Sequence, residues 1–319
     1  MEFEDIIKIR VSVDHITATS DDRIRIHFNS NTIKGYKHLG KIPTKGTEEE
    51  KEGYRVYHEY KNKETNNKVR VLTDRGDAYY LPNLTIKFFS SWVNNLKYEE
   101  VIRVLNDISK IYNMPFNLSQ YHVAIDLFSK DNHLDHLVKW IKSNRHYDPD
   151  ENPEQPGTYH FHKGGQGFNL VAYDKKKELH EKKKLTIESK QKLKNCNVTR
   201  IESRFYNASE IPSLMDLAIH NFIDLIPARI EFLMPDDTKL RKHGIKHHYM
   251  DIGIKGLRKQ LKRRGVRYNL FYYMKENTHL TNIIKEALNK YRWCDSPKDY
   301  PIVQPKIFIR PQGIKFIKH

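Results

Sequence analysis

The chain has 319 residues, and its 56 Lys and Arg against 40 Asp and Glu give a formal net charge of +16. This length predicts two domains, or one large domain with an appendage. The 14 glycines show no three-residue period, which excludes collagen, and no apolar run is long enough for a transmembrane helix. Residues 1–10 hold three acidic residues and no apolar stretch, so we expect no signal peptide. Two cysteines, Cys196 and Cys294, are too few for a disulfide framework or a four-ligand zinc site, which favours a cytoplasmic location.

The excess of positive charge indicates the class of partner rather than the fold. Basic residues alternate with aromatic ones, as in Arg-Tyr-Asn-Leu-Phe-Tyr-Tyr at residues 267–273, which suits a polyanion with stackable bases. The alternative is a lysine-rich composition that simply covers a solvated surface. The Gly-rich segment 163–167 lacks the Gly-Lys-Ser/Thr ending of a phosphate loop, which argues against an ATPase or helicase.

The first half of the chain is rich in predicted strands. Residues 6–16 and 23–28 alternate apolar and polar side chains, and further strands are predicted at about 54–60, 68–73, 78–81 and 84–89. Residues 98–112 carry apolar side chains at helical spacing, which predicts an amphipathic helix. A strand at 121–128 then leads into a helix around residues 134–141.

A predicted hairpin follows, with strands at 158–162 and 168–173 around the glycines of residues 163–167. Residues 174–195 contain many Lys and Glu and no Pro or Gly, which predicts an exposed helix, and residues 198–206 return to a strand pattern. Beyond residue 207 the pattern predicts helices at about 212–225, 238–262 and 280–291, with short strands at 268–273 and 306–317.

These elements predict an α+β fold, with a mostly antiparallel sheet, flanking helices and a mainly helical C-terminal region. We place a boundary near residue 207. Residues 1–206 then form a catalytic domain, and residues 207–319 form a basic region for DNA binding or an accessory role.

Tyr173 ends a predicted strand just before Lys175, Lys176 and Lys177. Cations close to a phenol stabilise the phenolate and lower its pKa, which suits a nucleophile, and they also attract a phosphodiester. The alternative is an ordinary tyrosine that packs its ring at a strand end.

Two acidic residues, Asp126 and Glu202, lie within apolar strands. Strand periodicity places Glu202 on the same face as Arg200 and Arg204. Carboxylates from neighbouring strands can hold Mg²⁺ or Mn²⁺, which would polarise a phosphate. Alternatively, each acid forms an ion pair with a nearby arginine.

Two further groups of residues have candidate roles. His160 and His162 share a strand face and form a candidate pair of metal ligands, unless they simply face solvent. The segment 255–265 contains Lys259, Arg263 and Arg264, which could lie along DNA phosphates or form a solvated cationic helix face.

The sequence Leu-Val-Ala-Tyr-Asp-Lys-Lys-Lys-Glu-Leu at 170–179, followed by Arg-Ile-Glu-Ser-Arg at 200–204, resembles the rolling-circle replication initiators. The similar families are the gene II endonucleases of filamentous phages and the plasmid replication initiation factors (Rep_trans). The resemblance covers roughly residues 6–205. It implies that Tyr173 is the nucleophile beside Lys175 and Glu178, that Glu202 is a metal ligand and that Arg200 contacts phosphate. Upstream, Asp126 fits the family pattern, whereas Ala124 stands where the family usually has arginine.

The resemblance implies a site- and strand-specific DNA nickase that forms a 5′-phosphotyrosine and frees a 3′-OH primer, with Mg²⁺ or Mn²⁺ as cofactor. Its expected partners are origin DNA, a host helicase and polymerase, and a second copy of the chain. It would act in the cytoplasm of a bacterial, archaeal or phage-infected cell. A non-catalytic DNA-binding regulator, a hydrolytic metal-dependent nuclease and a mobilisation relaxase are the alternatives.

Overall fold

The structure is a computed structural model. It describes residues 5–20, 33–51, 53–74, 84–143, 150–151, 157–161, 167–181, 186–206, 211, 213–223, 226, 230–242, 244, 249–265 and 270–300. The strands predicted at 23–28, 78–81 and 306–317, and the turn at 163–166, lie outside the described residues. None of the helices in the described ranges is long and apolar enough to cross a membrane.

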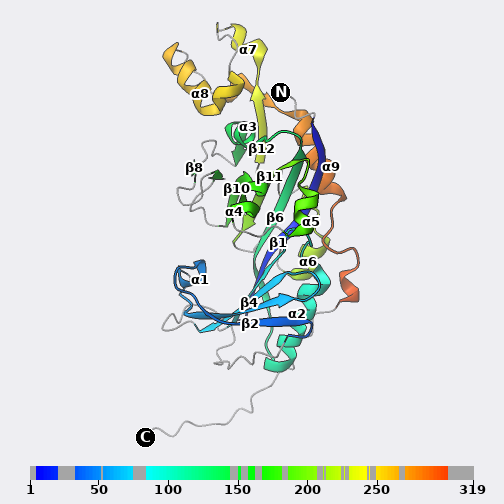
Figure 1. The fold of residues 1–319 in the computed structure, drawn as a ribbon. Coiled ribbons are helices and arrows are strands. Elements are labelled where there is room, and N and C mark those ends of the chain that lie inside the picture. The colour runs from blue at the N-terminus through cyan, green and yellow to red at the C-terminus, as the bar shows by residue number, and fades with distance from the viewer. Residues whose placement is uncertain are drawn as a thin grey trace, which may run out of the picture.

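Ten of the described strands form one large antiparallel sheet with the order β2-β3-β4-β5-β1-β6-β11-β10-β9-β8 (Figure 1). The strands are β1 (Ile6–Ser20), β2 (Tyr36–Pro43), β3 (Val56–Asn62), β4 (Lys68–Asp74), β5 (Leu84–Phe89), β6 (Asn117–Ser129), β8 (Asp150–Glu151), β9 (Thr158–His160), β10 (Phe168–Asp174) and β11 (Asn197–Phe205). The two long strands, β1 and β6, pair along most of their length at the centre of the sheet. This architecture confirms the predicted α+β class with a mostly antiparallel sheet.

Helices pack against both faces of the large sheet. The helices α2 (Tyr98–Tyr112), α6 (Leu214–Ile219) and α9 (Thr278–Lys290) lie on one face, while α1 (Glu48–Lys51) and α4 (Lys175–Glu181) lie on the other (Figure 1). The main hydrophobic core lies between the sheet and the helices α2, α6 and α9, and it includes Val123, Ile125 and Leu127 of β6. Since side chains alternate along a strand, the residues between them face the other side of the sheet.

The helix predicted at 98–112 is confirmed as α2, and its apolar stripe explains its position. Val101, Val104, Leu105 and Ile108 are fully or almost fully buried against the sheet. Burial of such side chains stabilises the fold by about 1.5–3 kcal/mol each. The helix ends at Asn113, which adopts the left-handed conformation that asparagine tolerates at helix ends.

Residues beyond 207 contribute to two cores. Helices α6 and α9 complete the main core, whereas a second, smaller core lies under α7 (Asp237–Lys242) and α8 (Tyr249–Arg263). A three-stranded sheet of β7 (Ile141–Ser143), β12 (Ile230–Pro235) and β13 (Met274–Glu276) supports this smaller core. We call α7, α8 and the 3-10 turn Leu270–Tyr273 the basic lobe, which extends from one end of the molecule (Figure 1).

Four predicted elements are wrong in detail. The helix predicted at 212–225 is only α6, which ends at Ile219 because His220 is extended. The continuous helix at 174–195 is divided into α4 and α5 (Ile187–Lys192), because the extended Thr186 starts α5 as its N-cap. The helix at 238–262 is divided into α7 and α8, with Gly244 in a left-handed conformation after α7. The strand predicted at 268–273 forms a 3-10 turn at residues 270–273, and the strand β13 begins only after it. The helix α3 (Leu134–Trp140) and the β9–β10 hairpin agree with expectation.

Candidate active site

Polar side chains line the sheet face opposite the main core, where β10, β11 and β6 lie side by side. Tyr173 pairs with Arg200, and Arg200 pairs with Asp126, so the three residues form a row across three strands. Directly paired residues in antiparallel strands share a face, which brings these side chains together. The sequence-predicted residues of the two motifs therefore meet on one surface.

A bulge in β1 adds a carboxylate to this face. The β1–β6 register shifts between Val13 and His15, so Asp14 is an extra residue in β1. Its side chain forms an ion pair with Arg200 at 3.0 Å and accepts a hydrogen bond from the Ser90 hydroxyl. His15 pairs with His122 of β6, and their ring centroids lie 4.6 Å apart.

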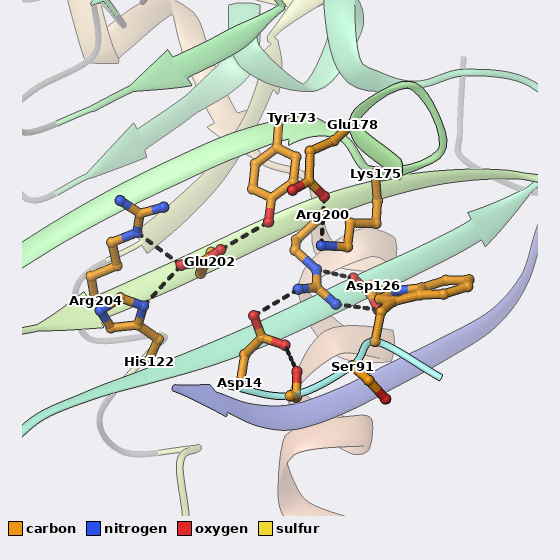
Figure 2. Close-up of polar contacts among 12 residues, drawn as sticks. Asp14, Ser91, His122, Asp126, Tyr173, Lys175, Glu178, Arg200, Glu202 and Arg204 are labelled. Atoms are coloured by element: carbon orange, nitrogen blue, oxygen red, sulfur yellow. Dashed lines mark hydrogen bonds and ion pairs between the residues drawn. The ribbon is translucent and has the colours of Figure 1, made fainter. Parts of the chain in front are cut away.

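Glu202 is the centre of the polar network in Figure 2. The Tyr173 hydroxyl donates to Glu202 Oε2 at 2.9 Å, while Arg204 Nε donates to Oε1 at 2.8 Å. His122 Nδ1 lies 3.0 Å from the same Oε1, and its Nε2 lies 2.7 Å from the Gln120 side-chain nitrogen. If Gln120 donates to Nε2, the neutral imidazole carries its proton on Nδ1 and donates it to Glu202.

These contacts keep Glu202 ionised. Burial by itself would raise the pKa of the Glu202 carboxyl, but Arg204 and His122 outweigh burial and hold this pKa well below its usual range. Burial lowers the pKa of His122, although Glu202 partly opposes this effect. The arrangement at neutral pH is therefore a carboxylate that accepts hydrogen bonds from a phenol, a guanidinium and a neutral imidazole.

The pKa of the Tyr173 phenol is raised well above its usual value, chiefly by burial and then by the negative charge of Glu202. The lowered pKa that the sequence pattern predicts for this phenol is therefore not observed. Arg200 has the expected lowering effect, but it is smaller than the two opposing effects. Activation of the hydroxyl consequently requires a base that accepts its proton, and Glu202 is in position for that role.

The residues after Tyr173 form the first turn of α4. Lys175 forms an ion pair with Glu178 at 2.7 Å, and its ammonium lies 5.5 Å from the centre of the Tyr173 ring. Lys176 turns away and donates to the carbonyl of Cys196 at 3.1 Å. Lys175 and Glu178 are thus brought to the tyrosine, whereas Lys176 holds α4 against the start of β11.

Arg200 and Asp126 are buried beneath this site. Arg200 donates to both Asp126 oxygens, at 2.6 and 2.9 Å, and its side chain is 1% exposed. Asp126 also accepts from Arg10 and from the Trp92 indole. Burial alone would raise the pKa of Asp126, but Arg200 and Arg10 hold it far below its usual value.

These contacts bear on the predicted roles of Arg200 and Asp126, which stay predictions. Arg200 has no exposed edge for a phosphate, so it positions carboxylates. Asp126 Oδ2 accepts from Arg200, Arg10 and the Trp92 indole, and Oδ1 accepts from Arg200, so protein donors already engage both oxygens that a metal ion would use. The Arg200–Asp126 ion pair agrees with the alternative role considered for Asp126, but the pair is buried rather than exposed.

The described residues do not fit a metal ion. No group of three or more His, Cys, Asp and Glu side chains in the described ranges is arranged to hold one. Glu202 is surrounded by an arginine, an imidazole and a phenol, and His160 Nδ1 lies 3.3 Å from the side-chain nitrogen of Asn169. His162 lies outside the described residues. A bound divalent cation would have to replace Arg204 at Glu202, since like charges repel.

Tyr173 and Glu202 line an open cavity of about 540 Å³. The cavity is also lined by Asp14, His15, Glu49, Arg70, Lys87, Phe89, Ser90, Trp92, Gln120, His122, Lys175, Glu178, Arg204 and Tyr206. The sequence motifs did not identify Glu49, Arg70, Lys87 or His122.

The predicted DNA-binding residues of the C-terminal region lie elsewhere. Lys259 and Arg263 are exposed on α8, and Arg264 is exposed just after it. Buried Leu257 and Leu261 on the inner side of α8 leave these cations on its outer side. The basic lobe is therefore a positively charged surface separate from the cavity lining.

Comparison with known proteins finds similarity to solved structures but no sequence match. No protein-family model and no curated protein sequence matches this chain. The chain is similar to the solved structure of a rolling circle replication initiator protein from Geobacillus stearothermophilus, with 12% sequence identity and a TM-score of 0.38. The similarity covers 77% of this chain and 94% of that one. A similarity at this level does not identify an activity, so function has to be argued from the site.

Proposed function

We propose that this protein nicks and rejoins DNA through Tyr173 and acts as a rolling-circle replication initiator. The observation that carries the proposal is the hydrogen bond from the Tyr173 hydroxyl to an ionised carboxylate, Glu202, in the wall of an open cavity. A hydroxyl nucleophile beside a base, with the base oriented by further groups, is the usual arrangement for covalent catalysis. The net charge of +16 and the resemblance of the two motifs support DNA as the substrate.

The chemistry follows from these contacts. Tyr173 Oη attacks the phosphorus of a phosphodiester while its proton passes to Glu202 Oε2. The bond from phosphorus to O3′ breaks, O3′ takes a proton from solvent, and the 5′ phosphate remains attached to Tyr173. The tyrosyl ester retains the energy of the phosphodiester, so the reverse attack by a 3′-OH rejoins DNA without ATP.

Substrate binding would itself activate the base. Arg204 side-chain exposure is 25%, and its guanidinium is one of the groups that lower the pKa of Glu202. A phosphate that attracts Arg204 would weaken that hold and make Glu202 a stronger base for the Tyr173 proton. Lys175, close to the tyrosine ring, would balance charge on the phosphate oxygens.

The proposal includes no step through a metal ion, because the described residues do not fit one. The requirement for Mg²⁺ or Mn²⁺ that the resemblance implies stays a prediction. It is checked by nicking in EDTA, with each cation added back.

The decisive experiment compares wild type with Tyr173→Phe on supercoiled DNA of the parent replicon. Nicking is read on a gel, and the covalent adduct is sought by mass spectrometry after nuclease digestion. We expect wild type to carry a nucleotide on Tyr173 and Tyr173→Phe to neither nick nor form the adduct. The matched control is Tyr206→Phe, since Tyr206 lines the same cavity, is 39% exposed and should nick at about the wild-type rate.

Other outcomes would support the alternative functions. Nicks that persist in Tyr173→Phe, without an adduct, would favour a hydrolytic nuclease. Tight binding with no nicks on DNA that contains the origin would favour a non-catalytic regulator.

A further inference from the structure

The cavity that contains Tyr173 is also lined by a separate set of charged residues from the first third of the chain. Arg70 of β4 and Lys87 of β5 lie on adjacent strands, and Glu49 of α1 is close to both. Together with Lys68 and Glu59, they form a group of three cations and two carboxylates. The cavity lining as a whole holds four Lys and Arg and four Asp and Glu, so an anionic ligand would depend on one well-placed cation rather than on net charge.

Arg70 is held rigidly from several sides. Its Nη1 donates to Glu49 at 2.8 Å and its Nε donates to Glu59 at 3.0 Å. The guanidinium also lies over two aromatic rings, 4.6 Å from the centre of Tyr57 and 5.0 Å from that of Phe89. Few other orientations are open to a planar group with two hydrogen bonds and two ring contacts.

The carboxylates that hold Arg70 stay ionised. Burial would raise the pKa of both Glu49 and Glu59, but Arg70 and the neighbouring lysines outweigh it and lower both pKa values. The two ion pairs therefore persist at neutral pH, and the guanidinium keeps one orientation with or without a ligand.

One edge of this guanidinium remains available. In the described part of the chain, Nη2 has no hydrogen-bond partner, and the Arg70 side chain is 26% exposed in the cavity wall. Arg200, which the sequence motif indicated as the phosphate contact, is 1% exposed and donates to two carboxylates. Of these two arginines, only Arg70 can reach a ligand without breaking a buried ion pair.

We propose that Arg70 binds a backbone phosphate of the DNA strand, next to the phosphodiester that Tyr173 attacks. This inference rests on the proposed function, and it adds a second point at which the strand is held. A preorganised guanidinium loses little entropy on binding and forms strong, directional hydrogen bonds to phosphate oxygens. Two fixed points would align the scissile bond with the tyrosine.

The test measures binding rather than nicking, in the Tyr173→Phe background. Single-stranded oligonucleotides that span the cut site each carry one neutral methylphosphonate linkage, and fluorescence anisotropy gives their affinities. We expect one linkage, other than the scissile one, to weaken binding roughly tenfold, as for removal of one hydrogen bond to a charged group. With Arg70→Gln added, this linkage should no longer matter, and the salt dependence of log K should decrease by about 0.7.

The controls distinguish the removal of one phosphate-binding group from damage to the fold. Arg103→Gln removes an exposed arginine on α2, on the other face of the sheet, and should leave every linkage effect unchanged. Because Arg70→Gln leaves Glu49 without its strongest partner, the double variant Glu49→Gln with Arg70→Gln provides a version with less unpaired buried charge. It should repeat the loss of the linkage effect.

Two results would overturn the assignment. If Arg70→Gln binds all oligonucleotides as the Tyr173→Phe parent does, Arg70 makes no phosphate contact. If Arg70→Gln weakens the binding of all oligonucleotides equally and the same linkage still reduces affinity, the role of Arg70 is structural. A Tyr173 adduct together with either result would reject the Arg70 site alone, whereas a linkage effect without any nicking would reject the nickase and retain the site.

Discussion

Two polar networks lie near Tyr173, a buried one around Arg200 and Asp126 and a cavity one around Arg204 and Glu202. Both pair an arginine with a carboxylate, but in different surroundings. In the buried network, Arg200 and Asp126 are almost completely buried, and Asp126 has both oxygens engaged by protein donors. In the cavity network, Arg204 and Glu202 form a similar pair, but Arg204 is 25% exposed and Tyr173 shares the carboxylate. Breaking the buried pair should lower the free energy of unfolding, and breaking the cavity pair should lower the rate of nicking.

The largest expected effect comes from the buried network. Asp126→Asn removes the carboxylate charge that Arg10 and Arg200 share and leaves Arg200 with Asp14 alone, and removing one partner of a buried ion pair costs about 3–5 kcal/mol. We expect urea unfolding to show a decrease of that size in the free energy of unfolding. Glu286→Gln is the control, because the exposed Lys290–Glu286 pair should contribute much less. Equal effects of the two changes would mean that burial does not distinguish them.

Glu202→Gln tests the cavity network. The amide keeps the shape of the side chain but cannot take the Tyr173 proton, so nicking should slow by about 10²-fold or more. Affinity for single-stranded DNA should change little, since Glu202 carries negative charge and contacts no phosphate. Single-turnover nicking and anisotropy on the same protein check both parts. A parallel loss of nicking and binding would contradict the assignment of Glu202 as the base.

Acid tests the buried network in a second way. The pKa of Asp126 in the folded protein is held below its ordinary value, so its ion pairs stabilise the fold at neutral pH, and that stability is lost as the pH falls below about 4. The free energy of unfolding should therefore decrease more steeply between about pH 4 and pH 3 in wild type than in Asp126→Asn. Parallel curves would show that other carboxylates dominate the acid response.

The sequence was sufficient for features that depend on local pattern. The amphipathic stripe predicted α2, and strand alternation placed Arg200, Glu202 and Arg204 on one face, as observed in β11. The tyrosine at the end of a strand, followed by Lys175, was likewise visible from spacing. These features involve neighbours within a few residues, where periodicity is informative.

The remaining parts of the site depend on pairing between distant strands. The bulge at Asp14 is set by the β1–β6 register, and His122 reaches Glu202 because β6 pairs with β11. Arg70 enters the same cavity from β4, more than a hundred residues before Tyr173. Sequence spacing contains no measure of such contacts, so the burial of Asp126 and the raised pKa of Tyr173 could not be predicted.

The smallest expected effect concerns the basic lobe, which differs from both networks because its cations are exposed. The triple change Lys259→Gln, Arg263→Gln and Arg264→Gln should reduce the salt dependence of duplex binding by about 0.9 in log K for each phosphate that is no longer neutralised. Nicking of a short single-stranded oligonucleotide should stay close to wild type, since none of these residues lines the Tyr173 cavity.

The control for the lobe is the same loss of charge at scattered positions, with glutamine at Lys110, Lys190 and Lys290, which are exposed on three other helices. If duplex binding depends on net charge alone, both triple variants will lose salt dependence equally. If the lobe contacts the duplex, only the triple variant in the lobe will lose salt dependence. A lobe variant that binds duplex normally but fails to nick the short oligonucleotide would instead connect α8 to the chemistry at Tyr173, and the division between cavity and lobe would be wrong.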